Sequence, residues 1–211
     1  KKIIEWVIIR LKRSKLLSEI ILATSSNIEN DIFIEIADKY KISIFRGSEN
    51  NVLERFAEAA KKYQAKNIIR VCADNPFIDP SEIDNLINYF SFEKVCYAFN
   101  HRNICQNNYA DGFGAEIFTN TLLAFLNKFA KDKNHREHVT SLIWDYPEIF
   151  NLGIMKANDN LAFPNLRFDI DHINDLTKLE NLIKNGVNIN SSAYEIISIA
   201  LKINNKNSEN L

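Results

Sequence analysis

The sequence has few cysteines, no charge excess and no long apolar run, and each absence excludes a class of protein. Cys72, Cys96 and Cys105 are odd in number and show no C-x-x-C spacing. We therefore expect reduced thiols in a cytoplasmic protein, with neither a disulfide framework nor a zinc site. The 26 Lys and Arg residues balance 27 Asp and Glu, so no global field favours nucleic acid or an anionic membrane. No apolar stretch approaches the roughly 18 residues of a membrane helix, and no signal peptide is visible.

Internal repeats, long linkers and low-complexity core segments are also absent. A chain of 211 residues with 46% hydrophobic content can bury one good core. We expect a single domain over residues 1–203, followed by a polar, flexible tail at 204–211. The chain opens with Lys1-Lys2 and no methionine, directly in a helical pattern. This opening indicates that the natural start lies upstream.

Helical and strand-like segments alternate through the first half of the chain. The patterns predict helices at about 3–13, 28–40, 51–63 and 80–90, and strands at 19–24, 42–45, 68–71 and 95–99. Such an order implies parallel strands joined by right-handed crossovers. The second half is less regular, with strands expected at 115–118, 150–155 and 166–169, and helices at 122–129, 136–146, 176–184 and 192–203. We predict an α/β fold with a mostly parallel central sheet flanked by helices.

The stretch Ile68–Pro80 contains the leading candidate for a functional residue. Its apolar strand turns polar at Asp74, and a helix start follows. Asp79 would be the N-cap of that helix, Pro80 its first residue, and Glu82 the acid that closes a capping box. Asp74 has no such structural role. An acid just past the carboxyl end of a buried parallel strand lies where open α/β sheets bind their ligands.

A second acid, Asp171, ends another strand-like segment. Residues 166–171 alternate, which would place Arg167, Asp169 and Asp171 on one face. Carboxylates of Asp74 and Asp171 converging from two strand ends would form a Mg²⁺ site, completed by waters and phosphate oxygens. Equally, Asp171 could cap the helix that starts near residue 173, and Asp74 could be a turn residue. Spacing alone does not separate these alternatives.

Small and polar residues follow the first two strands: Ala23, Thr24, Ser25, Arg46, Gly47 and Ser48. Such residues let a nucleotide base or ribose approach the backbone, and Arg46 could meet a phosphate or a carbonyl edge. Taken alone, Ser25 and Ser48 are more simply interpreted as cap and turn residues.

A third cluster combines the segment 109–116 with residues 136–140. Two glycines, one of them Gly112, allow tight backbone geometry before a strand. Arg136 could bind a hydroxy acid or a phosphate. His138 lies near a helix start, where a single histidine is more often a surface residue than a catalyst.

Together these motifs resemble the cytidylyltransferase family that activates sugars. The resemblance is to the spore-coat-polysaccharide type, related to the CMP-sialic acid and 3-deoxy-manno-octulosonate cytidylyltransferases. It covers nearly the whole chain up to about residue 203. The matching pieces stand in family order: Ile4-Glu-Trp-Val7, Ala23-Thr-Ser25, Phe45-Arg-Gly-Ser48, Asn51-Val-Leu-Glu-Arg55, Arg70-Val-Cys-Ala-Asp-Asn-Pro-Phe-Ile-Asp-Pro80, Asp111-Gly112 with Glu116, Arg136-Glu-His-Val-Thr140, and Arg167 with Ile170-Asp171.

The resemblance implies a nucleotide-diphospho-sugar transferase fold, Rossmann-like and of the GT-A type. It also implies a Mg²⁺-dependent reaction in which a sugar hydroxyl attacks the α-phosphate of CTP and pyrophosphate leaves, for surface polysaccharide or glycan synthesis. The metal-binding, catalytic acids would be Asp74 and Asp171. The nucleotide would meet Ala23, Thr24, Ser25, Arg46, Gly47 and Asp74. The sugar side and a homodimer contact, within residues 100–145, would include Asp111, Gly112, Glu116, Arg136 and His138.

The chain departs from the family pattern at three places. The family opens with a strand and a Gly-, Ser-, Arg- and Lys-rich loop that grips the triphosphate, whereas this sequence begins at the following helix. Gly114 replaces an acid, and His172 replaces a threonine. Two alternatives therefore stay open: a nucleotidyltransferase of the same fold that uses another nucleotide or a sugar phosphate, and an inactive homologue that binds nucleotide or a partner. Retention of Asp74 and Asp171 favours an enzyme, since an inactive site has no need for two unpaired acids.

Overall fold

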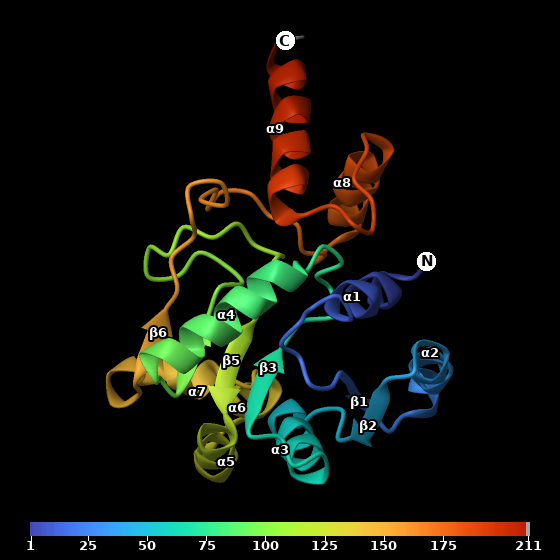
Figure 1. Cartoon of the computed structure of the whole chain (residues 1–211). Helices are drawn as coiled ribbons and strands as arrows, with labels where there is room; N and C mark the ends of the chain where they lie inside the picture. Colours follow the sequence, from blue (N-terminus) through green and yellow to red (C-terminus); the bar gives the residue numbers. More distant parts are fainter. Residues whose placement is uncertain (210–211) are drawn as a thin grey trace.

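The structure is a computed structural model that describes residues 1–209. From α1 to β4 its helices and strands alternate as the sequence predicts, and the second half of the chain is less regular (Figure 1). In chain order they are α1 (Ile3–Leu11), β1 (Ile21–Ser25), α2 (Ile32–Tyr40), β2 (Ser43–Gly47), α3 (Val52–Lys62), β3 (Asn67–Arg70), α4 (Pro80–Glu93), β4 (Tyr97–Phe99), β5 (Glu116–Thr119), α5 (Asn120–Phe129), α6 (Lys133–Glu137), α7 (Ser141–Asp145), β6 (Leu152–Ile154), α8 (Ile173–Lys184) and α9 (Ala193–Glu209). Within this part of the chain, no helix is long and apolar enough to cross a membrane.

The strands form two hydrogen-bonded groups. β1 and β2 pair in parallel, with Ile21 opposite Ser43 and Ser25 opposite Gly47. The other group has the order β3-β5-β4-β6. β4 and β6 are parallel, and β5 runs antiparallel to both of its neighbours. The predicted α/β fold with parallel strands and flanking helices is confirmed, but β3 and β4 do not pair, because the antiparallel β5 lies between them.

Helices cover both faces of the four-stranded sheet. Neighbouring residues of one strand point to opposite faces. Accordingly, Tyr97 belongs to a buried cluster with side chains of α3 and α5, whereas Ala98 belongs to a cluster with side chains of α1 and α4. The sheet is therefore a buried layer between α1 and α4 on one side and α3 and α5 on the other.

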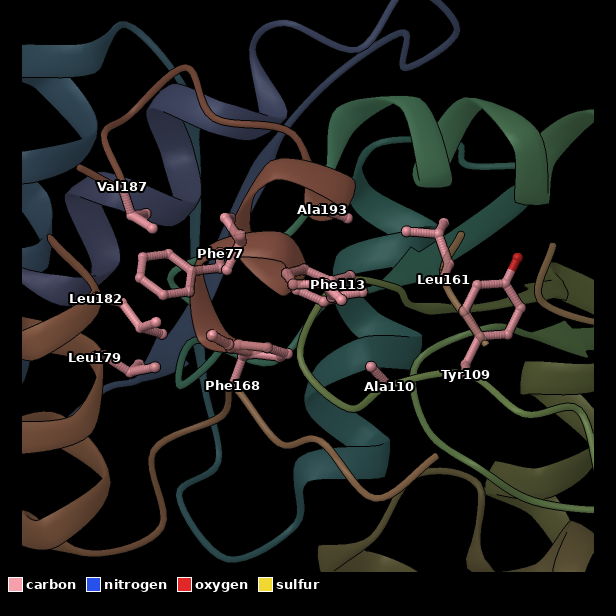
Figure 2. Close-up of a cluster of buried hydrophobic side chains, with 13 residues drawn as sticks. Phe77, Tyr109, Ala110, Phe113, Leu161, Phe168, Leu179, Leu182, Val187 and Ala193 are labelled. Atoms are coloured by element: carbon pink, nitrogen blue, oxygen red, sulfur yellow. The ribbon is translucent and has the colours of Figure 1, made fainter. Parts of the chain in front are cut away.

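A third core cluster joins the loops beyond the strands to α8 and α9. Figure 2 shows Phe77, Phe113 and Phe168 from three separate segments packed together in it. The rings of Phe113 and Phe168 lie 4.6 Å apart between centroids. This cluster holds the turn after β3, the loop before β5 and the segment before α8 against one another.

The start of α4 confirms part of the predicted capping scheme. The Asp79 carboxylate accepts a hydrogen bond from the Ser81 amide at 2.8 Å and another from the Ala193 amide at the start of α9. Glu82 forms no capping box. Its carboxylate instead accepts hydrogen bonds from the Tyr109 hydroxyl and from the side-chain amide of Asn85, both at 2.9 Å. The buried hydroxyl of Tyr109 needs an acceptor, so a tertiary contact replaces the local one.

Residues 166–169 are not the strand that their alternation predicts. They make one isolated parallel bridge, between Asp111 and Arg167. The Asp111 amide donates to the Leu166 carbonyl and the Phe168 amide donates to the Asp111 carbonyl, each at 3.0 Å. Pairing stops there because Gly112 turns the neighbouring chain away, with a φ of +105°.

Two helix predictions also need correction. The helix expected over 136–146 is two short helices, α6 and α7, separated by extended backbone at His138. The Thr140 hydroxyl, in that break, donates to the buried carboxylate of Glu116 at 2.7 Å. At the carboxyl end, α9 continues through residues 204–209, which the sequence predicts as part of a polar tail. No glycine or proline interrupts it, and residues 210–211 lie outside the described part of the chain.

Candidate active site

The turn after β3 and the segment before α8 are joined at Asp74. The Ile170 amide donates a hydrogen bond of 3.1 Å to the Asp74 carbonyl oxygen. Arg10, completely buried, donates to the carbonyl oxygens of Ile78 (2.6 Å) and Phe77 (3.3 Å). These bonds fix the turn on both sides. The two acids that the sequence singles out, Asp74 and Asp171, are thereby brought to the same edge of the sheet.

The carboxylates gathered at this edge act on one another. Loss of hydration raises the pKa of Asp74, although the residue is open to solvent, and the charges of Asp169 and Asp171 raise it further. Burial, followed by the charge of Asp169, raises the pKa of Asp111 to about 6. Four carboxylates thus share one negative field. We refer to Asp74, Asp111, Asp169 and Asp171 as the acidic cluster.

Arg167 forms ion pairs with two carboxylates of this cluster. Its guanidinium donates to Asp169 from Nε at 3.1 Å and to Asp171 from Nη2 at 2.6 Å, and Nη2 also contacts the second oxygen of Asp169. These bonds raise the pKa of Arg167 further. The Asp169 side chain is only 11% exposed, but the Arg167–Asp171 pair is open to solvent, so the net contribution of that pair to folding is small. A phosphate or a metal ion can therefore displace it at little cost.

Asp171 does not cap α8, which answers one of the alternatives left open by the sequence. The N-cap residue is His172, and its amide donates to the Asp175 carboxylate at 3.0 Å. The Asp171 amide donates to the same carboxylate at 3.3 Å. Asp175 satisfies the helix start, and the Asp171 side chain stays in the acidic cluster.

The donor set at the cluster fits a hard divalent cation. In residues 1–209, no group of three or more His, Cys, Asp or Glu side chains is placed to hold a metal ion. Mg²⁺ does not require such a cage, since it takes one or two carboxylates together with waters and substrate phosphates. Asp74 and Asp171 offer only oxygen donors, and the repulsion that raises the pKa of Asp74 would be relieved by a dication.

Gly112 directly follows Asp111 of the acidic cluster, so these two predicted site residues lie together. A Cβ added to Gly112 would lie 2.8 Å from the Phe168 carbonyl carbon and 3.0 Å from the Asp169 amide nitrogen. Only glycine allows this approach of the two backbones. Gly112 therefore places Asp111 beside Asp169.

The residues predicted to contact the nucleotide lie at the carboxyl ends of β1 and β2. Thr24 and Ser25 are buried, and the Ser25 hydroxyl accepts hydrogen bonds from the Asn30 side chain (2.6 Å) and the Asn27 amide (3.3 Å). Ser25 thus has the turn role that was the simpler interpretation. Because β1 and β2 are parallel, their ends present one common loop surface.

Arg46 is tied to that same loop surface. It pairs with Asp31 at 2.7 Å and donates to the carbonyl oxygen of Asn27 at 2.8 Å. A Cβ on Gly47 would come within 2.9 Å of the Phe45 ring, so glycine is needed there for close packing. Ala23 borders a cavity between β1 and β3.

Glu116 lies in the interior, away from any solvent-accessible substrate surface. It is 2% exposed and accepts hydrogen bonds from the Tyr97 hydroxyl at 2.6 Å and the Thr140 hydroxyl at 2.7 Å, besides its ion pair with Arg70. Burial acts to raise the pKa of Glu116, but Arg70 and the hydrogen bonds outweigh it and lower the pKa to about 2. Its carboxylate organises the protein core beside the site.

Arg136 and His138 are separate from the acidic cluster. The Arg136 guanidinium donates to the carbonyl oxygens of Asn127 (3.1 Å) and Ala130 (2.9 Å) and so satisfies the end of α5. His138 is exposed. In the described residues, no hydrogen bond or ion pair links either side chain to Asp74 or Asp171.

Asp169 and Arg167 are not among the site residues predicted from the sequence. The alternation in 166–171 does place both of them on one face with Asp171. The pattern does not predict that Asp111 and Asp74 lie next to that face. Their position depends on backbone hydrogen bonds that join Asp111 to Leu166 and Phe168, and Asp74 to Ile170.

Comparison with known proteins shows the family to which the chain belongs. A family model described as cytidylyltransferase matches residues 1–197. An uncharacterized protein of Methanocaldococcus jannaschii is 34% identical over 195 residues, covering 92% of this chain and 78% of the relative. The spore coat polysaccharide biosynthesis protein SpsF of Bacillus subtilis is 29% identical over 182 residues, covering 85% and 73%.

Solved structures show the same fold. A cytidylyltransferase from Leptospira borgpetersenii superposes with a TM-score of 0.88 at 28% identity, over 97% of this chain and 85% of that one. A CMP:2-keto-3-deoxy-manno-octonic acid synthetase complexed with CTP superposes with a TM-score of 0.63 at 11% identity, over 89% of both chains. The chain belongs to the cytidylyltransferase family and is a nucleotidyltransferase with the Rossmann-like fold of that family.

Proposed function

We propose that the protein is a Mg²⁺-dependent cytidylyltransferase that transfers CMP from CTP to a sugar hydroxyl and releases pyrophosphate. The observation that carries the proposal is the convergence of Asp74 and Asp171, joined through the Ile170–Asp74 backbone bond, in a chain of this family. The name of the Bacillus subtilis relative supports a product used in surface polysaccharide synthesis. The family model, described as cytidylyltransferase, supports CTP as the nucleotide.

The residues of the acidic cluster and Arg167 would have different roles in the reaction. Asp74 and Asp171 would hold Mg²⁺, which when bound neutralises charge on the phosphates. Arg167, released from Asp171, can donate to a phosphate oxygen. Asp111, with its pKa raised to about 6 by burial and by Asp169, is suited to accept the proton of the attacking sugar hydroxyl near neutral pH.

The loops after β1 and β2 would receive the nucleotide. Thr24 and Ser25 offer small, buried side chains, and Gly47, which is partly buried, offers backbone groups at the same edge. Arg46 keeps the two loops together. Arg136 and His138 would act at the sugar side or at a subunit contact, apart from the metal. Catalysis in this scheme is mainly positioning and electrostatic stabilisation of an in-line displacement.

The test is pyrophosphate release from CTP with a panel of sugars, with and without Mg²⁺. We expect release only with Mg²⁺ and the cognate sugar, and a loss of at least about a hundredfold in Asp74→Asn. Asp159→Asn is the matched control, since Asp159 is an exposed acid outside the cluster. Full activity of Asp74→Asn would refute the site assignment.

The fold does not select the nucleotide or the acceptor. Proteins named as a glucose-1-phosphate thymidylyltransferase and a molybdopterin-guanine dinucleotide biosynthesis protein share it at 12% and 15% identity. Thermal-shift measurements with CTP, UTP and GTP separate the alternatives, because the cognate nucleotide stabilises the protein by mass action. A shift with UTP or GTP and none with CTP would replace CTP in the proposal.

We also propose a cytoplasmic homodimer. Cys72, Cys96 and Cys105 are unpaired, as expected in a reducing compartment. Phe125 and Phe129 on α5 are 39% and 44% exposed, with their rings 4.5 Å apart, inside the region 100–145 predicted to hold the subunit contact. Light scattering of the purified protein would show a dimer, and Phe129→Glu would shift it to monomer if α5 forms the contact.

A further inference from the structure

Arg10 of α1 is completely buried, although its guanidinium carries a charge. Burial lowers the pKa of Arg10 to about 10, so the side chain stays protonated at neutral pH. Nε donates to the Ile78 carbonyl oxygen at 2.6 Å, Nη2 to that of Phe77 at 3.3 Å and Nη1 to that of Ile189 at 3.0 Å. A buried cation is costly unless its donors are satisfied. The three carbonyl oxygens are therefore held in fixed positions around one planar group.

Trp6 adds a second contact between α1 and the same turn. It lies four residues before Arg10, on the same face of the helix. Its ring meets the buried ring of Phe77 edge-on, with 5.8 Å between the centroids and 64° between the planes. α1 thus holds residues 77 and 78 through one side chain and two backbone carbonyl groups.

Asp74 lies within the turn that α1 holds. The Asn75 amide donates to the Cys72 carbonyl oxygen at 3.3 Å, and the Ile78 amide donates to the Asn75 carbonyl oxygen at 3.1 Å. These bonds lead from the end of β3 to Ile78, where Arg10 binds. Asp74 is inside this short turn, so the direction of its carboxylate depends on how the turn is fixed.

We propose that Arg10 is a positioning residue for the transfer reaction, which fixes the turn after β3 so that the Asp74 carboxylate can bind Mg²⁺. Arg10 touches neither metal nor substrate in this role and acts only through the carbonyl oxygens of Phe77 and Ile78. The inference rests on the metal-binding role of Asp74 proposed above. Removing a partner that orients a metal ligand typically changes metal affinity or activity by about tenfold to a hundredfold.

A counter-charge for Asp79 would be a different role for Arg10, and it predicts a different outcome. Asp79 lies close enough to act on the charge of Arg10, but the Asp79 carboxylate already accepts hydrogen bonds from the amides of Ser81 and Ala193. Arg10→Lys separates the two roles, because lysine keeps the charge but lacks the planar fork that reaches two carbonyl oxygens at once. The counter-charge survives this change, whereas the fixed turn does not.

Arg13 provides the matched control. It is on the segment that directly follows α1, is exposed, and donates to the carbonyl oxygens of Ile189 at 3.1 Å and Asn190 at 3.4 Å. It thus shares the Ile189 contact with Arg10, but its side-chain hydrogen bonds in the described chain do not reach the turn after β3. Arg13→Met therefore perturbs the segment before α9 and leaves the turn alone.

The experiment measures pyrophosphate release from CTP over a range of Mg²⁺ and sugar concentrations, at a temperature well below the Tm of each variant. We expect Arg10→Lys to raise the Mg²⁺ concentration for half-maximal rate by at least about tenfold. The KM for the sugar should change by less than about twofold, since the turn carries the proposed metal ligand and not the sugar-side residues. The Tm shift produced by Mg²⁺ alone should shrink in the same variant. Arg13→Met should match the natural chain in all three measurements.

A lower Tm with unchanged Mg²⁺ dependence in Arg10→Lys would overturn the inference and leave the proposed reaction intact. If Arg10→Lys does not fold, Trp6→Leu loosens the same turn and keeps the guanidinium. It should also raise the Mg²⁺ requirement without changing the KM for the sugar, and an unchanged Mg²⁺ requirement would again overturn the inference. Absence of Mg²⁺-dependent release in the natural chain would instead refute the proposed reaction, together with the inference that rests on it.

Discussion

The Ile170 amide donates a 3.1 Å hydrogen bond to the Asp74 carbonyl oxygen. Through it, the turn after β3 and the segment before α8 present their carboxylates at one place. The same bond brings Asp169 and Asp171 close enough to raise the pKa of Asp74. An electrostatic site is thereby built from two segments that are far apart in the chain.

Removing Arg167 should strengthen metal binding. Within residues 1–209, Arg167 is the one ion-pair partner of Asp169 and Asp171, and Arg167→Gln would remove it. Their repulsion would then favour a dication. We expect Mg²⁺ to raise the Tm more in Arg167→Gln than in the natural chain, and the added shift to vanish in Arg167→Gln/Asp171→Asn. An equal Mg²⁺ shift in all three proteins would contradict a metal site at Asp171.

Glu116 should make the protein sensitive to acid. Its folded pKa of about 2 lies below the ordinary 4.5, despite burial, because Arg70 and its hydrogen-bond donors favour the charged form. A carboxyl group whose pKa is lowered by folding stabilises the protein at pH values above its unfolded-state pKa. This stabilisation is lost as pH falls from about 4.5 towards 2. At neutral pH it corresponds to about 3 kcal/mol.

The measurement is urea unfolding at pH 7 and at successive pH values down to 3. Glu116→Gln should be destabilised at pH 7, and the difference from the natural chain should shrink as pH falls. Glu148→Gln, at an exposed position outside this network, is the control. A destabilisation that stays constant with pH would assign the effect to packing and not to charge.

Asp111 should change the folding stability with pH in the opposite direction to Glu116. Burial and Asp169 raise its folded pKa from 3.8 to about 6, so the charged form is disfavoured by folding. Its stability penalty is absent below pH 3.8 and grows as pH rises to about 6. Asp111→Asn should therefore stabilise the protein at pH 7, by about 1 kcal/mol after allowance for partial exposure, while lowering cytidylyl transfer. Greater stability at pH 7 with full activity would remove Asp111 from the proposed mechanism.

Gly112 and Gly186 form a matched pair for backbone strain. Both have positive φ, +105° and +112°, but a Cβ on Gly112 would meet the Phe168 backbone at 2.8 Å, and a Cβ on Gly186 would meet nothing within 4 Å. Gly186→Ala should cost about 1 kcal/mol from φ alone. Gly112→Ala should cost clearly more and should also reduce activity, because Asp111 and Asp169 would separate. Similar unfolding free energies for the two variants would show that the backbone at residue 112 can move away from Phe168 at little cost.

Much of the fold is readable from local patterns in the sequence. Helical and strand periodicity predicts the alternation from α1 to β4, and Asp79-Pro80 marks the start of α4, where the Asp79 carboxylate caps Ser81. These features depend on neighbours within a few residues, so a linear pattern contains them. The placement of Asp74 after a buried strand is local in the same sense.

The tertiary structure decided which polar groups stay available for chemistry. Glu116 and Arg136 are residue types that often bind substrates. The Glu116 carboxylate, however, accepts hydrogen bonds from Arg70, Tyr97 and Thr140. The Arg136 guanidinium donates to a carbonyl oxygen at the end of α5. Asp171 is a local case, since Asp175, four residues further on, accepts the amides of Asp171 and His172 at the start of α8. The partners of Glu116 are set by packing and lie 19 to 46 residues away in the chain. The sequence by itself determined the elements and the candidate acids, and the fold determined which acids meet, because burial and hydrogen bonding act between segments that no local pattern connects.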